Sequence, residues 1–143
     1  MVRTEGLSKD FVDPKKGPVH AVRDFSFSAS PGEILGLLGV NGAGKTTCLR
    51  MLSTIIRPSA GTAQVAGFSV LEQPEKVRAS IGFLSTSTAL YGRLNPIEVL
   101  TYFAELYGLN REQIKQRIEF AVEKLKIAPF ADRLGDKLST GQK

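Results

Sequence analysis

The sequence is poor in two residue types that often mark disulfide frameworks and proton-transfer sites. Among its 143 residues it has one cysteine, Cys48, and one histidine, His20. A single cysteine excludes an internal disulfide framework and is typical of proteins in a reducing cytosol. His20 lies in a stretch that we expect to form an N-terminal strand, so we interpret it as a surface residue rather than a catalyst.

Long hydrophobic runs are also missing. The longest strongly apolar run lies around residues 34–40, which is far short of the roughly 20 residues that a membrane-spanning helix needs. Residues 1–5 lead directly into polar sequence and do not look like a secretory signal. We therefore expect that any role at a membrane depends on a partner protein.

The positive charge of the chain is not clustered. The formal net charge is +5, a value that can attract nucleic acid or an anionic membrane surface. However, the basic residues are scattered, and only Lys15 and Lys16 form an adjacent pair. This pattern favours a solvated surface that steers anionic nucleotides, with no nucleic-acid partner. Apolar residues at 42% and charged residues at 23% are typical of one globular domain.

Residues 39–47 are the feature around which the rest of the chain is organised. They fit the phosphate-loop pattern of a glycine, four free positions and then Gly-Lys-Thr. The segment reads Gly39, Val40, Asn41, Gly42, Ala43, Gly44, Lys45, Thr46 and Thr47. Residues 33–38 predict a short buried strand before the loop. Residues 48–52 continue it as a helix that we expect to end near Ile56, because Pro58 follows.

The residue types in this loop suit a bound nucleotide. Glycines let the backbone turn tightly and approach a ligand closely. Successive N–H groups then form a nest for phosphate oxygens at the positive end of the following helix. Lys45 supplies a point charge for the outer phosphates, and the Thr46 hydroxyl can bind Mg²⁺. The alternative is a glycine-rich turn between a strand and a helix that binds nothing.

Cys48 lies in the first turns of the helix that follows the loop. Two interpretations are open for it. The positive helix end can lower the pKa of a thiol and make it reactive, or the side chain is a small buried packing residue. We favour the packing role, since free cysteine is among the most buried residue types.

Other strands and helices are expected on both sides of the loop. Strands are predicted over residues 2–8, 19–28, 62–65 and 81–84, and a helix over residues 74–80. From about residue 91 the pattern changes to paired helices. The chain is therefore predicted to contain a nucleotide-binding core with a β subdomain in residues 1–90, and a helical subdomain in residues 91–143.

The two helices of the second part have clear start signals. Asn95 followed by Pro96 predicts the first helix, which Gly108 ends, and Asn110 followed by Gln113 has the spacing of a capping box. Each helix has an apolar stripe that we expect to face a core. The stripe residues are Val99, Leu100, Phe103, Leu106 and Tyr107 in the first helix, and Ile114, Ile118, Ala121, Val122 and Leu125 in the second.

A short motif near the end of the chain resembles the signature of ATP-binding-cassette (ABC) ATPases, whose common form is Leu-Ser-Gly-Gly-Gln. It reads Leu138, Ser139, Thr140, Gly141 and Gln142. Five residues are a weak match alone, but here they follow a phosphate loop and a helical part in the family's order. Residues 7–11 look like the family's adenine-binding segment. Residues 81–84, 90–94 and 102–109 resemble its exporter branch, and most of all the sodium-export and drug-export subunits.

The resemblance implies a fold and an activity. The fold would be α/β, with a P-loop NTPase core, an N-terminal antiparallel β subdomain and a helical subdomain, incomplete at the C-terminus. The activity would be ATP hydrolysis coupled to export through a separate integral membrane subunit, which would dock near residues 91–107. In this family two ATP-binding subunits sandwich two ATP molecules, so the resemblance implies a homodimer, Mg²⁺ as cofactor and a peripheral position on the cytoplasmic side of the membrane.

Individual residues receive roles from the same resemblance. Phe11 would stack on adenine, although aromatic residues are also common in ordinary strands. Lys45 would act in catalysis on the β and γ phosphates, and Thr46 on the metal. The nucleotide-binding set is Phe11, Gly39, Asn41, Gly42, Ala43, Gly44, Lys45, Thr46, Thr47 and Thr86. The set that contacts the opposite subunit's ATP is Ser139, Thr140, Gly141 and Gln142.

The chain departs from the family pattern in three ways. Thr86 stands where the family usually has a glutamine that reaches the metal and the attacking water, and Thr140 replaces a glycine of the signature. The strand ending in Asp-Glu, which supplies a metal contact and the general base, and a later switch histidine do not occur in residues 1–143. We therefore expect the front part of a longer gene product, which binds ATP but does not turn it over alone.

Two other functions are compatible with a phosphate loop. A soluble ABC protein acting on nucleic acid or ribosomes usually carries long coiled-coil insertions, and none is visible between residues 39 and 142. A phosphate-loop kinase or GTPase would leave residues 138–142 unexplained, and no guanine-selecting motif is present. An exporter subunit is therefore the leading hypothesis.

Overall fold

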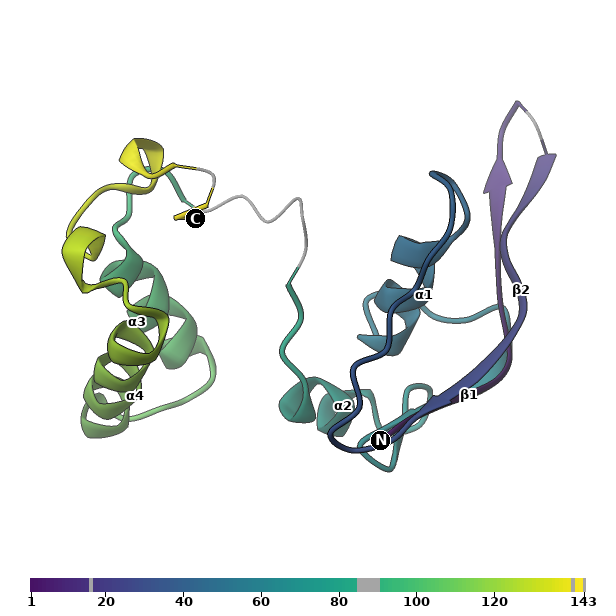
Figure 1. The fold of residues 1–143 in the computed structure, drawn as a ribbon, viewed down its shortest axis with the longest axis horizontal. Helices are drawn as coiled ribbons and strands as arrows, with labels where there is room; N and C mark the ends of the chain where they lie inside the picture. Colours follow the sequence, from purple (N-terminus) through teal and green to yellow (C-terminus); the bar gives the residue numbers. More distant parts are fainter. Residues whose placement is uncertain (16, 85–90, 140, 143) are drawn as a thin grey trace. The chain divides into compact units, whose positions relative to one another are not determined.

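The computed structural model describes residues 1–15, 17–84, 91–139 and 141–142. Figure 1 shows the course of the chain, which divides into two compact units, Met1–Leu84 and Ser85–Lys143. The first unit holds all the strands of the described residues and two helices, and the second holds only helices. Each unit is described by itself below.

An antiparallel sheet forms the frame of the first unit. Its strands are β1 (Val2–Asp13), β2 (Gly17–Ala29), β3 (Ala60–Val65) and β4 (Phe68–Ser69), in the order β2-β1-β3-β4. The strands predicted over residues 2–8, 19–28 and 62–65 are present as β1, β2 and β3. β1 and β2 are longer than expected because they pair along a long hairpin (Figure 1). This sheet confirms the antiparallel β subdomain.

Two helices, α1 (Lys45–Leu52) and α2 (Pro74–Ser80), complete the core of the first unit. Leu7, Met51 and Val77 are fully buried, and Val22, Cys48 and Val65 are nearly so. A side chain of this size contributes about 1.5–3 kcal/mol when it is fully buried. Packing of Met51 and Cys48 in this core fixes α1 in the unit. It thereby also fixes the start of α1, which directly follows the phosphate loop.

The first helix ends earlier than the sequence predicts. It ends at Leu52 instead of near Ile56, so the expectation that Pro58 sets its end was wrong. The N–H groups of Ile55 and Ile56 both donate to the carbonyl oxygen of Arg50, and Thr54 has a left-handed φ of 62°. The backbone therefore reverses before the proline is reached.

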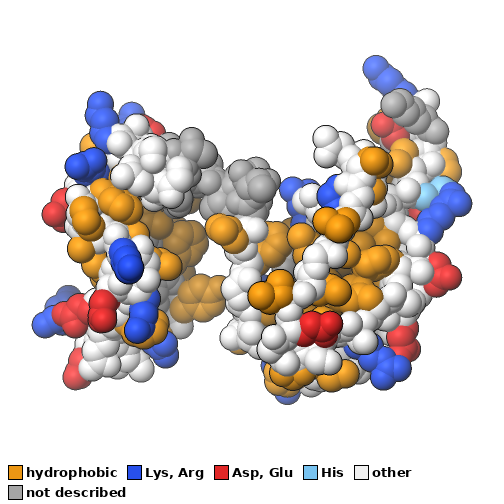
Figure 2. All heavy atoms as spheres, in the orientation of Figure 1, with side chains coloured by type: hydrophobic (Ala, Val, Ile, Leu, Met, Phe, Trp, Pro, Cys, Tyr) orange, Lys and Arg blue, Asp and Glu red, His pale blue; other side chains and the backbone are white. Residues whose placement is uncertain are grey.

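The predicted strands over residues 33–38 and 81–84 are not formed. Neither segment has strand structure, and Ile34, Leu38 and Leu84 are 99%, 96% and 92% exposed. A strand needs a neighbour to pair its backbone groups, and none of the four strands in the described residues pairs with either segment. The prediction of a buried strand before the phosphate loop was therefore wrong, and Figure 2 shows apolar side chains at the surface of this unit.

The second unit is built on α3 (Pro96–Leu106) and α4 (Arg111–Leu125), followed by the 3₁₀ turns η1 (Ala128–Phe130) and η2 (Gly135–Lys137). Both predicted helix starts are confirmed. The Asn95 side chain accepts a hydrogen bond from the Glu98 N–H, and Asn110 does the same for Gln113. Both glutamate and glutamine side chains bond back to the cap residue, so each helix begins with a complete capping box.

The apolar stripes of these helices are buried only in part. Val99 and Ile114 are buried, whereas Phe103, Leu106 and Tyr107 are 47%, 64% and 78% exposed. Leu125 is 67% exposed, so the prediction that both stripes face a core was wrong at these positions. Two helices pack along one shared face, and side chains of each stripe that lie away from this face stay partly exposed. No helix in the described part of the chain is long and apolar enough to cross a membrane.

Candidate functional site

The loop of residues 39–47 has the backbone geometry of an anion-binding turn. Gly42 and Gly44 are left-handed, with φ values of 85° and 84°. The Ala43 N–H donates to the Val40 carbonyl at 3.2 Å, which closes the turn. Gly44 caps α1, and its carbonyl oxygen accepts the Cys48 N–H at 2.8 Å. The loop therefore leads directly into the positive end of a helix.

Gly44 lies directly against β2. A Cβ atom at this position would lie 2.2 Å from the carbonyl oxygen of Ala21 and 2.9 Å from Cγ2 of Val22. The left-handed φ and the lack of space both require glycine here. Sequence reasoning explained Gly44 by its approach to a ligand, but did not find that it also fixes the loop against a strand. No sequence signal marks Ala21.

The loop encloses a hollow of about 240 Å³ that is suited to phosphate. Its lining residues are Ala21, Asn41, Gly42, Ala43, Gly44, Lys45, Thr46 and Thr47. The first N–H groups of a helix have no intrahelical partner, and no side chain caps the start of α1. Such groups bind phosphate oxygens well. Seven of the ten residues predicted to bind nucleotide thus line one hollow. Gly39 packs against the same turn, because a Cβ atom added at Gly39 would lie 3.2 Å from the Cβ of Ala43.

Lys45 is folded over the loop. Its Nζ atom donates to the carbonyl oxygens of Gly39 and Val40, at 2.6 and 2.8 Å. These bonds hold a positive charge at the centre of the turn, next to the hollow. No acidic side chain is among the residues that line the hollow. The local charge therefore favours an anion.

The residues of the loop fit a magnesium nucleotide better than a free metal ion. No group of three or more His, Cys, Asp or Glu residues that could hold a metal ion occurs in the described residues. Mg²⁺ usually takes one or two protein oxygens, with substrate phosphates and water completing its shell. Thr46 supplies one hydroxyl oxygen and is exposed at the start of α1. Its role as a metal ligand stays a prediction.

Cys48 is a packing residue in this structure. It is 4% exposed, and burial raises the pKa of its thiol. The alternative of a thiol activated by the helix end is therefore wrong, because desolvation opposes formation of the thiolate. The preferred interpretation, a small buried residue, is confirmed.

Phe11 and His20 lie on the hairpin that borders the loop. Phe11 pairs with Val19 in the β1–β2 register and is 43% exposed. It does not line the phosphate hollow, and its stacking on a base stays a prediction. The Nδ1 atom of His20 lies 2.7 Å from Oδ1 of Asp10, and both side chains are exposed, as expected for surface residues.

The signature residues lie in the second unit. The Ser139 N–H donates to Oε1 of Gln142 at 3.0 Å, and the Gln142 N–H donates to the Ser139 carbonyl at 3.0 Å. Leu138 is buried beneath this turn, whereas Ser139 and Gly141 are exposed. Thr140 and Thr86, which were also predicted to act on nucleotide, lie outside the described residues. The turn thus presents a serine and a glycine to solvent.

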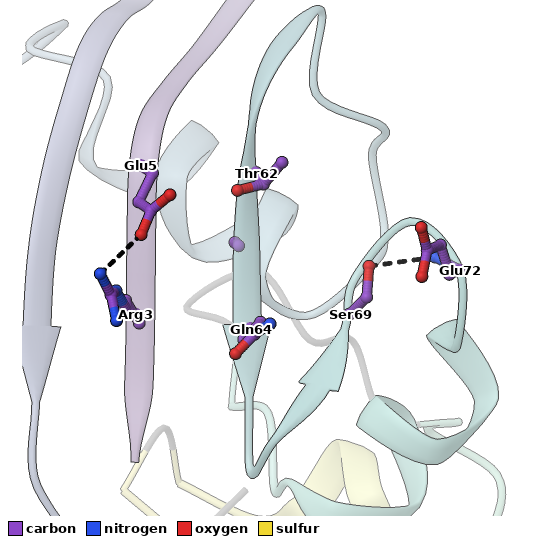
Figure 3. A pocket seen from close by; sticks show the side chains of 7 residues that line it. Arg3, Glu5, Thr62, Gln64, Ser69 and Glu72 are labelled. Carbon is purple, nitrogen blue, oxygen red and sulfur yellow. Dashed lines mark hydrogen bonds and ion pairs between the residues drawn. The ribbon is translucent and has the colours of Figure 1, made fainter.

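A second polar hollow lies on the sheet and has no predicted role (Figure 3). It is lined by Arg3 and Glu5 of β1, Thr62, Ala63 and Gln64 of β3, Ser69 of β4, and Glu72 beyond β4. Two of its three charged side chains, those of Arg3 and Glu5, are paired with each other. Arg3 forms an ion pair with Glu5 at 2.8 Å, and the Glu72 N–H donates to Oγ of Ser69 (Figure 3). We assign no ligand to it.

Comparisons with known proteins point to one family. Residues 22–143 match the family model described as ABC transporter. The chain is 42% identical over 144 residues to the ABC transporter ATP-binding protein NatA of Bacillus subtilis, covering 100% of this chain and 58% of that protein. It is 37% identical over 128 residues to the doxorubicin resistance ATP-binding protein DrrA of Mycobacterium tuberculosis, covering 90% and 39%. The chain therefore spans about three fifths of the length of NatA and about two fifths of that of DrrA.

Solved structures support the same fold. The ATP-binding cassette MJ0796, in a dimeric post-hydrolysis state bound to ADP and Pi, aligns with a TM-score of 0.82 at 22% identity. The alignment covers 99% of this chain and 65% of that one. At this identity the likeness concerns the fold alone, and it agrees with an incomplete cassette core.

Proposed function

The chain belongs to the ABC transporter family, and from this premise we propose that it forms the ATP-binding part of an exporter's ATP-hydrolysing subunit. The observation that carries the proposal is the loop of residues 39–47. Its left-handed glycines, the uncapped start of α1 and the Lys45 ammonium converge on one hollow that lacks acidic groups. These are the features that bind the phosphates of a nucleotide.

The proposed ligand is ATP with Mg²⁺. The N–H groups of residues 42–47 bind the phosphates, Lys45 neutralises the outer phosphate charge, and Thr46 binds the metal. Phe11 stacks on the base. Ser139, Thr140, Gly141 and Gln142 act on the ATP of a second subunit, and Thr86 belongs to the nucleotide-binding set at the position of the family's glutamine. Residues 1–90 are thus the nucleotide-binding part and residues 91–143 the signature-bearing part.

The proposed partners are a second ATP-binding subunit and an integral membrane subunit. Support for the first is the dimeric state of the related cassette MJ0796. Support for the second is the description of the relatives as transporter ATP-binding proteins. Export of a drug follows the name of the relative DrrA, a doxorubicin resistance ATP-binding protein. Export of sodium follows the resemblance of residues 81–84, 90–94 and 102–109 to sodium-export subunits, and the whole protein would lie on the cytoplasmic side of the membrane. Copurification with a membrane protein tests this part, and a purely soluble complex would contradict it.

Titration with a fluorescent ATP analogue and Mg²⁺ tests nucleotide binding. Lys45→Ala removes the charge beside the hollow, so we expect the affinity to fall at least about tenfold, the scale on which a charge-assisted hydrogen bond acts. Lys115→Ala, at an exposed position on α4, is the matched control and should bind as the unaltered chain does. Equal affinity in the Lys45 variant would contradict the proposal.

We further propose that residues 1–143 alone bind ATP without turning it over. Phosphoryl transfer to water needs a group that positions the water and metal or cationic groups that neutralise the developing charge. The residues that line the phosphate hollow include no carboxylate and no histidine. Phosphate release by the chain should therefore equal that of its Lys45→Ala variant. Steady release that depends on Lys45 would show that a base lies within these residues.

A further inference from the structure

Lys9 makes two contacts that the proposed site does not explain. Its Nζ atom donates to the carbonyl oxygen of Arg57 at 2.8 Å and lies 5.2 Å from the centroid of the Phe11 ring. A lysine ammonium at this distance is attracted to the face of an aromatic ring. Lys9 thus connects the segment after α1 to the ring that is proposed to stack on the base.

The segment that carries the Arg57 carbonyl is itself fastened to β1. The Ser59 N–H donates to the Ser8 carbonyl at 2.9 Å, and the Asp10 N–H donates to Oγ of Ser59 at 3.0 Å. The acceptor of Lys9 therefore has a fixed place beside β1. A long side chain held between a fixed carbonyl and a ring restricts the motion of that ring.

Phe11 lies close enough to the phosphate loop for one nucleotide to contact both. Phe11 pairs with Val19 in β2, and Ala21, two residues further along that strand, lies against Gly44 of the loop. At about 3.3 Å per residue, Val19 and Ala21 are separated by roughly 7 Å along the strand. Phe11 is 43% exposed, so a planar base can reach its ring.

We propose that Lys9 is a positioning residue for the nucleotide base, which holds the Phe11 ring in its stacking orientation. This inference rests on the proposed binding of ATP by residues 39–47. Lys9 is not among the residues that line the phosphate hollow. Its loss therefore weakens only the part of the affinity that comes from the base. Stacking tolerates every base, so ATP and GTP should weaken together.

The test measures the affinity of the full chain for ATP, GTP and inorganic tripolyphosphate, each with Mg²⁺, by calorimetry. Lys9→Met keeps the length of the side chain but removes its charge and its hydrogen bond. We expect about twofold to fivefold weaker binding of both nucleotides, the range for a cation over a ring, with unchanged binding of tripolyphosphate. Lys9→Arg should restore most of the loss. In a Phe11→Ala background, Lys9→Met should have no further effect.

Lys76 provides the matched control, because its Nζ atom lies 5.5 Å from the Phe68 ring in the same unit. Lys76→Met should leave all affinities unchanged. An unchanged ATP affinity in Lys9→Met, or in Phe11→Ala, would overturn the inference. Equal losses for ATP and tripolyphosphate would also overturn it, since they would place the effect on the loop or the fold. Failure of the unaltered chain to bind any of the three ligands would instead contradict the proposed function itself.

Discussion

At the scale of single residues, Gly44 and Gly42 offer a controlled comparison. Both are left-handed, but a Cβ at Gly44 would meet Ala21 and Val22, whereas a Cβ at Gly42 would meet nothing within 4 Å. Gly42→Ala should therefore cost only the backbone strain of about 1–2 kcal/mol. Gly44→Ala adds a clash with backbone and should cost clearly more. Urea unfolding of both variants measures the difference, and equal losses would mean that β2 moves away without cost.

Cys48 predicts a pH dependence. Because burial raises the pKa of its thiol, the folded chain holds this proton at a pH where the unfolded chain releases it. The contribution to stability is complete below the ordinary thiol pKa of about 8.5 and is lost as the pH rises through the folded value. The free energy of unfolding should therefore fall more steeply in the unaltered chain than in Cys48→Ala as the pH rises above the ordinary thiol pKa.

Alkylation offers an independent check of the same residue. The buried thiol should react slowly in the folded chain and quickly in urea. Rapid alkylation of the folded chain at neutral pH would contradict both the burial and the direction of the pKa shift.

At the scale of elements, the capping boxes decide where the two long helices start. Asn110→Ala removes the side-chain acceptor of the Gln113 N–H at the start of α4, so we expect a loss of about 0.5–2 kcal/mol. Gln116→Ala, at an exposed position inside α4, is the control and should be neutral or slightly stabilising, because alanine has the highest helix propensity. Denaturant unfolding followed by circular dichroism measures both. A loss no larger than that of the control would show that packing alone sets the start of α4.

At the scale of the whole molecule, the exposed apolar segment before the phosphate loop predicts self-association. Ile34 and Leu38 are 99% and 96% exposed on a segment without strand structure that has no strand neighbour in the described residues. Apolar, unpaired segments of this kind invite pairing with other chains. The double variant Ile34→Ser, Leu38→Ser should remain monomeric at higher concentration in sedimentation velocity.

Val12 provides a comparison for this prediction. It is 85% exposed but lies near the tip of the β1–β2 hairpin, in a strand that is already paired. Val12→Ser should change association much less. If the Val12 variant is as effective as the double variant, general surface hydrophobicity rather than the unpaired segment drives association.

The sequence alone determined the features that depend on near neighbours in the chain. The phosphate loop was predictable because its turn, its left-handed glycines and the start of α1 all involve residues within one short segment. The caps at Asn95 and Asn110 were predictable for the same reason, since each bonds to a residue three positions away. The family followed from the order of such local motifs.

Only the tertiary structure decided the features that depend on distant neighbours. Residues 33–38 have the apolar pattern of a buried strand, yet a strand forms only where another strand pairs with it, and here none in the described residues does. The burial of Cys48 and the contact of Gly44 with Ala21 likewise come from packing across the core. An apolar stripe such as that of α3 shows which face of a helix can be buried. Which residues of the stripe are buried depends on where a neighbour packs against the helix.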